Sequence, residues 1–300
     1  MANSLSTSAA IPIPAARDVL ALLKPITWFP PMWAFLCGVV SSGVPVGERL
    51  PFLLTGVLLT GPLVCGTSQA VNDWFDRHVD AINEPNRPIP SGRVAGCWGL
   101  RIAVIGTSLA AVVAWTAGIW VFSATLLGLA CAWAYSAPPL RLKADGWAGP
   151  AVVALTYEGL TWFTGAAVML GTLPSTDILA VLLLYSLGAH GIMTLNDFKA
   201  VEGDRATGIR SLPVRLGVAN AARLACAVMA VPQIFVVALL YQWGLTLSAG
   251  IVGVLVLVQF GLMARLLRDP KALAPWYNAT GTTCYVFGML AAALGLGGVI

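Results

Sequence analysis

The sequence predicts an all-α membrane protein, a bundle of nine transmembrane helices, and three observations support that class. Apolar residues fill 58% of the 300 positions and charged residues only 10%, whereas a soluble domain carries about 25% charged residues. Apolar stretches near the length that crosses a bilayer, roughly 20 residues, recur between polar breaks. Basic residues collect in every second break. These features exclude a secreted disulfide scaffold, a disordered chain and an ordinary cytosolic enzyme.

The predicted spans follow one another between charged segments or segments rich in Pro and Gly. Gly and Ala are frequent in them beside Leu and Val, which allows helices to pack closely in lipid. Short alternating strands of a β-barrel do not fit stretches of this length. The boundary at 118–119 is the weakest, because no charge separates the third span from the fourth. The spans cover 26–44, 50–71, 101–118, 119–136, 148–171, 177–195, 221–241, 246–266 and 278–298.

The distribution of Lys and Arg predicts the orientation of the bundle. With alternating helices, 16 of the 17 basic residues lie on the side of the N-terminus, and Arg49 alone lies on the other. The positive-inside rule makes the basic side cytoplasmic. We expect a flexible tail over 1–17, without a cleavable signal peptide, and one transmembrane domain over 18–300. The six cysteines show no CxxC pair or metal-ligand spacing, so we expect them to be unpaired.

The first chemical motif, NDWFDRHVD at 72–80, follows the second span. On a helix, Asp73, Asp76 and Asp80 fall within about 60° of one face. Like charges on one face repel each other, and a divalent cation would relieve that repulsion. Oxygen ligands favour Mg²⁺, which usually bridges to phosphate oxygens. The alternative is a solvated helix end.

A second motif, NDFKAVEGDR at 196–205, follows the sixth span. Asp197 and Asp204 have the spacing of the outer acids of the first motif, but Ala200 replaces the middle acid. A continuous helix would direct Glu202 about 140° away from Asp197, so its role stays open. Two acidic clusters on one side of the membrane suggest two Mg²⁺ sites that face a shared cavity.

Basic side chains stand beside both acidic motifs. Metal ions and cations together suit a diphosphate, because they bind its oxygens and neutralise its charge as it departs. No Walker A or GxGxxG loop is present, so a nucleotide cradle is not expected. The positive-inside rule alone accounts for Arg265, Arg268 and Lys271. The cations near the motifs are Arg77, Arg87, Arg93, Arg141, Lys143, Lys199, Arg205 and Arg210.

The two motifs and the nine spans resemble the UbiA superfamily of intramembrane prenyltransferases, over residues 18–290. The resemblance implies a UbiA-type bundle whose central cavity opens toward the cytoplasmic side. Several stretches are similar to the chlorophyll and bacteriochlorophyll synthase branch, and the first and fourth of them look more like its bacteriochlorophyll enzymes. They are KPITWFPPMW (24–33), NRPIPSGR (86–93), YSAPP (135–139), GAHGIMTL (188–195) and NDFKAVEGDR (196–205).

The resemblance implies transfer of a geranylgeranyl or phytyl group from its diphosphate to the C17 propionate of bacteriochlorophyllide a, assisted by two Mg²⁺ ions. An apolar cavity would shield the allyl cation from water, and Tyr135 would either steady that cation with its ring face or bond a leaving oxygen. The implied metal ligands and catalytic acids are Asp73, Asp76, Asp80, Asp197 and Asp204. The expected diphosphate contacts are Asn72, Arg77, Arg87, Lys143, Asn196, Lys199 and Arg205.

The implied setting is an intracytoplasmic photosynthetic membrane, that is, a bacterial inner membrane, with the active-site loops on the cytoplasmic side. Membrane lipid and other proteins of pigment biosynthesis or photosystem assembly are the further expected partners, and nucleic acid is not. The prenyl donor's reduction state and the oligomeric state stay open.

Two polar residues lie inside predicted spans. Glu158 is roughly 15 Å deep, and His190 is roughly 9 Å from the acidic end of its span. An ionisable residue at such a depth is costly and indicates function. Glu158 either faces the cavity in its protonated form or bonds a neighbouring helix. His190 either ligates the magnesium of a chlorin or is a buried, hydrogen-bonded histidine.

Other classes of protein fit the sequence less well. An ion-coupled transporter would place its acids near the bilayer midplane, and a structural pigment-binding protein would need several intramembrane histidines. A chlorophyll a synthase, or a UbiA-type prenyltransferase of a quinone or haem pathway, differs only in its acceptor.

Overall fold

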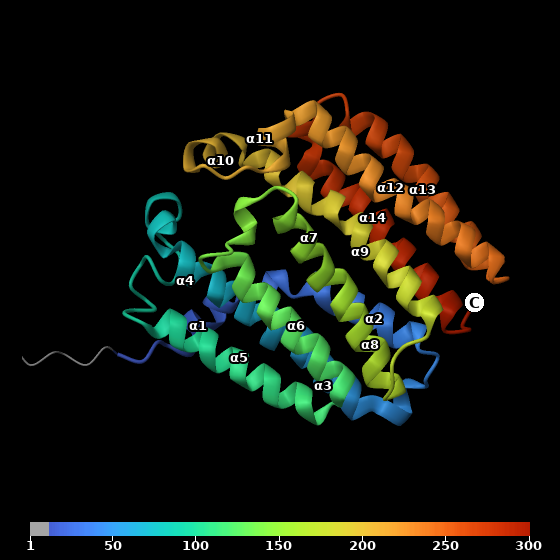
Figure 1. Ribbon diagram of the computed structural model, residues 1–300, viewed down its shortest axis with the longest axis horizontal. Helices are drawn as coiled ribbons and strands as arrows, with labels where there is room; N and C mark the ends of the chain where they lie inside the picture. The colour runs from blue at the N-terminus through green and yellow to red at the C-terminus, as the bar shows by residue number, and fades with distance from the viewer. Residues whose placement is uncertain (1–11) are drawn as a thin grey trace, which may run out of the picture.

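The computed structural model describes residues 12–300, and in that range the chain is almost entirely helical (Figure 1). No β-strand forms among these residues, and an isolated bridge pairs Asp145 with Arg210. The tail expected over 1–17 lies largely in residues 1–11, outside the described residues, and the first helix begins at Ala16.

The α-helices follow one another in the order expected of a multi-pass bundle. They are α1 (Ala16–Leu23), α2 (Phe29–Ser41), α3 (Leu50–Leu58), α4 (Gly66–Asn83), α5 (Trp98–Thr116), α6 (Ile119–Ser136), α7 (Ala148–Ala154), α8 (Thr161–Leu170), α9 (Thr176–Asn196), α10 (Val201–Thr207), α11 (Leu212–Leu216), α12 (Val218–Gln242), α13 (Thr246–Leu266) and α14 (Pro270–Leu296).

Eight helical stretches of the described chain are long and apolar enough to cross a membrane, or up to nine if a bent pair is one span. The predicted all-α class and the span count are thus confirmed. The weakest predicted boundary, at 118–119, is a turn between α5 and α6. Gly118 forms this turn with φ +108°, a conformation that glycine adopts without a steric penalty.

The first predicted span, 26–44, is not one straight helix. The stretches Ala16–Thr27 and Phe29–Ser41 meet at 59°. Lys24 ends α1 in the left-handed region, and Pro25 then begins a 3₁₀ turn. Prolines 30 and 31 follow at the start of α2, where their missing N–H groups cost no hydrogen bond. Helix α1 therefore lies at a steep angle to the first membrane helix.

Spans two and five each contain a π-helical segment. The segment η3 (Leu59–Cys65) joins α3 to α4, and η5 (Leu155–Leu160) joins α7 to α8. Pro62 lies inside η3 and has no N–H to donate. Such widened turns are frequent at functional sites, and residues of both segments line the same cavity.

The core is closely packed through small residues. Helices α2 and α8 touch at Gly38 and Gly165, where an added Cβ would lie 2.0 Å from the carbonyl oxygens of Trp162 and Phe35, respectively. In Figure 1, α3–α6 form one flank of the bundle and α12–α14 the other, and α2 lies with α7–α9 between them, packed against α8 and α14. The ends of α4 and α10 lie at the same end of the bundle in Figure 1, and residues of both line one cavity.

Candidate active site

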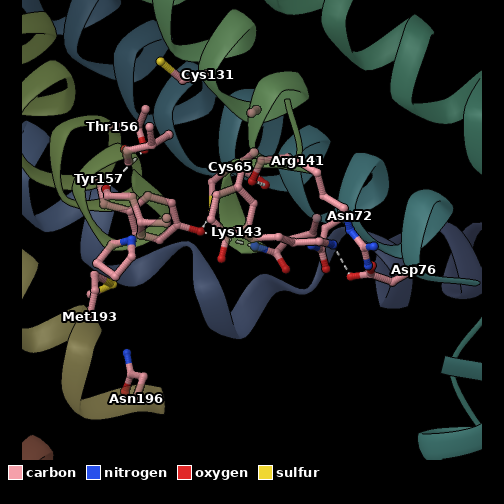
Figure 2. A pocket seen from close by; sticks show the side chains of 18 of the residues that line it. Cys65, Asn72, Asp76, Cys131, Arg141, Lys143, Thr156, Tyr157, Met193 and Asn196 are labelled. Carbon is pink, nitrogen blue, oxygen red and sulfur yellow. Dashed lines mark hydrogen bonds and ion pairs between the residues drawn. The ribbon is translucent and has the colours of Figure 1, made fainter. Parts of the chain in front are cut away.

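A cavity of about 540 Å³ lies between α4, α6, α7, η5 and α9 (Figure 2). Its inner part is lined by small and apolar side chains such as Val64, Gly128, Ala132 and Val153. Its charged end carries residues of both Asn-Asp motifs. The cavity thus has the shape and polarity required by a ligand with an anionic head and an apolar tail.

In the first motif, Asn72, Asp76 and Asp80 line the cavity. They are four residues apart on α4, so they form a continuous stripe on that helix. Asp73 does not line this cavity. Its side chain is buried, and its Oδ1 lies 2.7 Å from Lys24 Nζ and 3.4 Å from Arg87 Nη1.

Of the three acids predicted to share one face, Asp76 and Asp80 line the cavity and Asp73 does not. Helical periodicity places Asp73 at the edge of this face, where Lys24 from the end of α1 meets it. Asn72 takes the place in the stripe that the sequence analysis gave to Asp73. The spacing of 72, 76 and 80 is visible in the sequence, but the position of Lys24 is not.

Cations accompany the acids of the first motif. Lys143 forms an ion pair with Asp76, and Arg141 Nη2 is 3.7 Å from the same carboxylate. Arg87 Nη1 lies 2.8 Å from Asp80 Oδ2. Burial disfavours the charged form of Lys143 and lowers its pKa, although Asp76 partly offsets this effect. Lys143 and Arg141 both line the cavity, while Arg87 approaches it only through Asp80.

The second motif contributes Asn196, Asp197 and Asp204 to the cavity. Helix α9 ends at Asn196, a 3₁₀ turn covers Asp197–Lys199, and α10 carries Asp204. The Ser211 hydroxyl donates a hydrogen bond of 2.7 Å to Asp204 Oδ2, and burial raises the pKa of Asp204. Glu202 lies outside the cavity, exposed, with its Oε1 2.5 Å from Lys271 Nζ.

The structure does not bring every predicted contact to the cavity. Arg77 stacks its guanidinium 4.2 Å from the ring centre of Trp74, and Lys199 and Arg205 are not cavity-lining residues. Glu158 and His190 do not line the cavity either.

Both intramembrane residues are buried instead. His190 Nε2 lies 3.3 Å from the Trp147 carbonyl, so His190 is a hydrogen-bonded histidine that supports the loop after α6. Glu158 Oε2 has no partner within the described residues. Tyr135 does line the cavity, as expected.

Sequence reasoning missed a polar group in the inner part of the cavity. The Tyr157 hydroxyl of η5 accepts a hydrogen bond of 3.2 Å from Gln69 Nε2, and Cys65 Sγ lies 3.4 Å from it. Ser68 lines the cavity beside them. Positions 65, 68 and 69 continue the helical stripe of Asn72 by one and two turns, and this periodicity is the signal that could have revealed them.

The loop after α6, which carries Arg141 and Lys143, is joined to the segment between α10 and α11. Gly146 N donates to Arg210 O, and Arg210 N donates to Ala144 O, both at 3.0 Å. An added Cβ at Gly146 would lie 2.5 Å from Leu212 N, so this contact requires glycine. The bridge connects the cations that meet the first motif with the segment that carries Ser211.

The cavity presents oxygen ligands suited to Mg²⁺. The polar side chains that the two motifs contribute to its lining are carboxylates and amides, without a thiol or an imidazole. Among residues 12–300, no group of three or more His, Cys, Asp or Glu side chains gathers to hold a metal ion. Mg²⁺ usually takes one or two carboxylates together with substrate phosphates rather than an all-protein cage. The side chains therefore fit a metal that arrives with a diphosphate.

The fold and the cavity define a multi-pass helical membrane protein with paired Asn-Asp motifs at the polar end of an apolar chamber. The model of the UbiA prenyltransferase family matches residues 27–281, and the chain belongs to this family. The chain is 58% identical over 287 residues to the bacteriochlorophyll synthase 33 kDa chain of Cereibacter sphaeroides, covering 96% of this chain and 95% of that protein.

Two further proteins place the chain within the family. The chloroplastic chlorophyll synthase of Avena sativa is 37% identical, over 92% of this chain and 75% of that protein. The structure of a UbiA homologue from Archaeoglobus fulgidus bound to GPP and Mg²⁺ superposes with a TM-score of 0.72 at 19% identity, over 91% of this chain and 99% of that one. This last likeness concerns the fold, and it bears out the predicted UbiA-type bundle.

Proposed function

We propose that this protein is a bacteriochlorophyll synthase, which joins a geranylgeranyl or phytyl group to the C17 propionate of bacteriochlorophyllide a and releases diphosphate. The observation that carries the proposal is the 58% identity to the Cereibacter sphaeroides bacteriochlorophyll synthase chain over nearly the full length of both. The lower identity to the Avena sativa chlorophyll synthase favours the bacterial pigment as the acceptor.

The diphosphate of the prenyl donor binds at the polar end of the cavity. Asn72, Asp76 and Asp80 on one side and Asp197 and Asp204 on the other supply the oxygens for Mg²⁺, with Asn196 beside them, and two ions fit two motifs. The bound Mg²⁺ would withdraw electrons from the diphosphate and make it a better leaving group. The homologue from Archaeoglobus fulgidus carries Mg²⁺ with its prenyl diphosphate, which supports this assignment.

The cations beside the acids stabilise the leaving group. Lys143 and Arg141 line the cavity and exchange their contact with Asp76 for the diphosphate oxygens. Because Lys143 is buried, its charge acts in a medium that screens it less than water does. We assign Arg87 and Asp73 to support of the site, since Arg87 joins Asp73, Asp80 and Glu84.

The apolar part of the cavity holds the prenyl chain and excludes water from the allylic carbon as its C–O bond breaks. Tyr135 lines the cavity, and we assign its ring or hydroxyl to the reacting end of the prenyl diphosphate. The propionate of the acceptor is ionised at neutral pH and attacks the allylic carbon directly. No protein base is required for this step.

The chain resides in a photosynthetic bacterial inner membrane, with its charged loops on the cytoplasmic side. The 16-to-one distribution of basic residues supports this orientation. Proteins that deliver the pigment or receive the product would approach the same side.

The test is an esterification assay with purified membranes, Mg²⁺, geranylgeranyl diphosphate and bacteriochlorophyllide a. We expect a prenylated pigment, absent with Asp76→Asn. A chlorophyllide acceptor and a hydroxybenzoate acceptor run in parallel. Prenylation of hydroxybenzoate without any pigment ester would refute the proposed acceptor, and a clear preference for chlorophyllide would favour a chlorophyll synthase.

A further inference from the structure

The two asparagines that open the two motifs are held in opposite orientations. Asn72 Nδ2 donates to Ser136 Oγ at 3.2 Å, so its Oδ1 remains available to the cavity. Asn196 Oδ1 accepts from Asn278 Nδ2 at 2.9 Å, so its Nδ2 remains available. Figure 2 shows the Asn196 amide nitrogen directed toward the other labelled side chains of the cavity.

Asn278 stands on α14, 82 residues from Asn196 in the sequence and outside both motifs. Its own Oδ1 is buried and has no hydrogen-bond partner within the described residues. A buried carbonyl oxygen without a partner costs free energy. An apolar side chain would avoid this cost, so the donated hydrogen bond to Asn196 accounts for an asparagine at this position.

The two orientations suit different chemistry. An amide oxygen is a ligand for Mg²⁺, whereas an amide N–H₂ group repels a cation and donates to a phosphate oxygen. We propose that Asn278 is a positioning residue, which fixes Asn196 as a hydrogen-bond donor to the diphosphate while Ser136 fixes Asn72 as an oxygen ligand. This inference deepens the proposed function and rests on its diphosphate site.

Substitutions at position 278 test the orientation directly. Asn278→Leu keeps a similar volume and removes the donor, which frees the Asn196 amide to rotate. Asn278→Asp offers only acceptors, which draws Asn196 Nδ2 away from the cavity and turns its Oδ1 inward. Thr282→Val is the matched control, because Thr282 lies one turn further along α14 and its hydroxyl is also buried without a partner within the described residues.

The measurement is the Kd of geranylgeranyl diphosphate at saturating Mg²⁺ without acceptor, beside thermal unfolding in the same detergent. We expect the Kd of N278L to rise about three- to tenfold, which corresponds to the loss of one hydrogen bond. The Kd of N278D should rise further. Thr282→Val should bind like the unchanged protein, and the Mg²⁺ concentration for half-maximal binding should stay the same in N278L.

Three outcomes would overturn the inference. An unchanged Kd in N278L, with or without a lower unfolding temperature, would make Asn278 a packing residue. Unchanged binding in N278D would mean that Asn196 presents its oxygen. An equal loss in T282V would trace the effect to α14 in general. Because no acceptor is present, a wrong assignment of the pigment leaves this measurement valid, whereas the absence of any diphosphate binding in the unchanged protein would refute the proposed site itself.

Discussion

Replacing Lys143 by Met is the most direct test of how this site stabilises a leaving diphosphate. The side chain of Lys143 is 10% exposed and lines the cavity, whereas that of Arg141, the other cation near Asp76, is 44% exposed. A more solvated charge at 3.7 Å from Asp76 cannot replace the buried one. Loss of one preorganised donor to developing negative charge reduces kcat by about 10²–10³-fold, and we expect a reduction of this size.

The assay is the initial rate of pigment esterification at saturating geranylgeranyl diphosphate and bacteriochlorophyllide a. Arg77→Met is the matched control, because Arg77 is a cation one residue from Asp76 but stacks on Trp74 away from the cavity. It should retain nearly the full rate. Thermal unfolding of both variants shows whether the protein remains folded.

The pH dependence gives an independent check. Burial lowers the pKa of Lys143 below that of an ordinary lysine, so its proton is lost earlier as the pH rises. The rate should therefore fall on the alkaline side below pH 10.5, and Lys143→Arg, with a group that stays protonated, should move this decline upward. A K143M rate above a tenth of the original, or an equal loss in R77M, would refute the reasoning.

Further predictions concern support of the site, its acids and its metal. Asp73→Asn should lower the unfolding temperature, because breaking a buried ion pair costs about 3–5 kcal/mol. The Mg²⁺ requirement of the folded variant should stay unchanged. A changed Mg²⁺ requirement at normal stability would make Asp73 a metal ligand after all. Asp145→Ala should destabilise the fold by about 0.5–2 kcal/mol in thermal unfolding. The reason is that Asp145 Oδ1 accepts hydrogen bonds from the N–H groups of Trp147 and Ala148 at the start of α7. Asp145→Asn keeps a side-chain oxygen and should retain most of that stability. Burial raises the pKa of Asp204. Binding of the prenyl diphosphate with Mg²⁺ should therefore weaken as the pH falls through that raised value. Binding isotherms at several pH values should show this acidic decline in affinity, and Asp204→Asn should flatten it. Removal of Mg²⁺ with EDTA should abolish the esterification, and added Mg²⁺ should restore it; full activity in EDTA would contradict the metal role.

Hydropathy predicted the spans well because lipid requires a long apolar segment in every crossing. It failed where the ends of helices are polar. Helix α14 begins at Pro270, eight residues before the predicted 278, because Asp269 accepts from Ala272 N and caps a first turn that hydropathy treats as loop. The break between α1 and α2 depends on backbone conformation at Lys24, which composition does not report.

The site was predictable where it depends on spacing along one helix and unpredictable where it depends on contacts between distant segments. Asp76 and Asp80 followed from the helical period. The separation of Asp73 from the cavity depends on Lys24, 49 residues earlier, and the orientation of Asn196 depends on Asn278, 82 residues later. Such contacts arise only when the bundle closes, so a single sequence does not reveal them.

The bridge between Ala144–Gly146 and Arg210 also has a consequence for how the protein matures. Residue 210 emerges from the ribosome after six spans have been made, so the loop that carries Lys143 lacks its backbone partners until then. The polar end of the cavity is therefore completed late in synthesis, and a chain truncated before residue 210 would have the first motif without a finished binding site. A finished binding site therefore requires at least the first six spans and the segment that follows them.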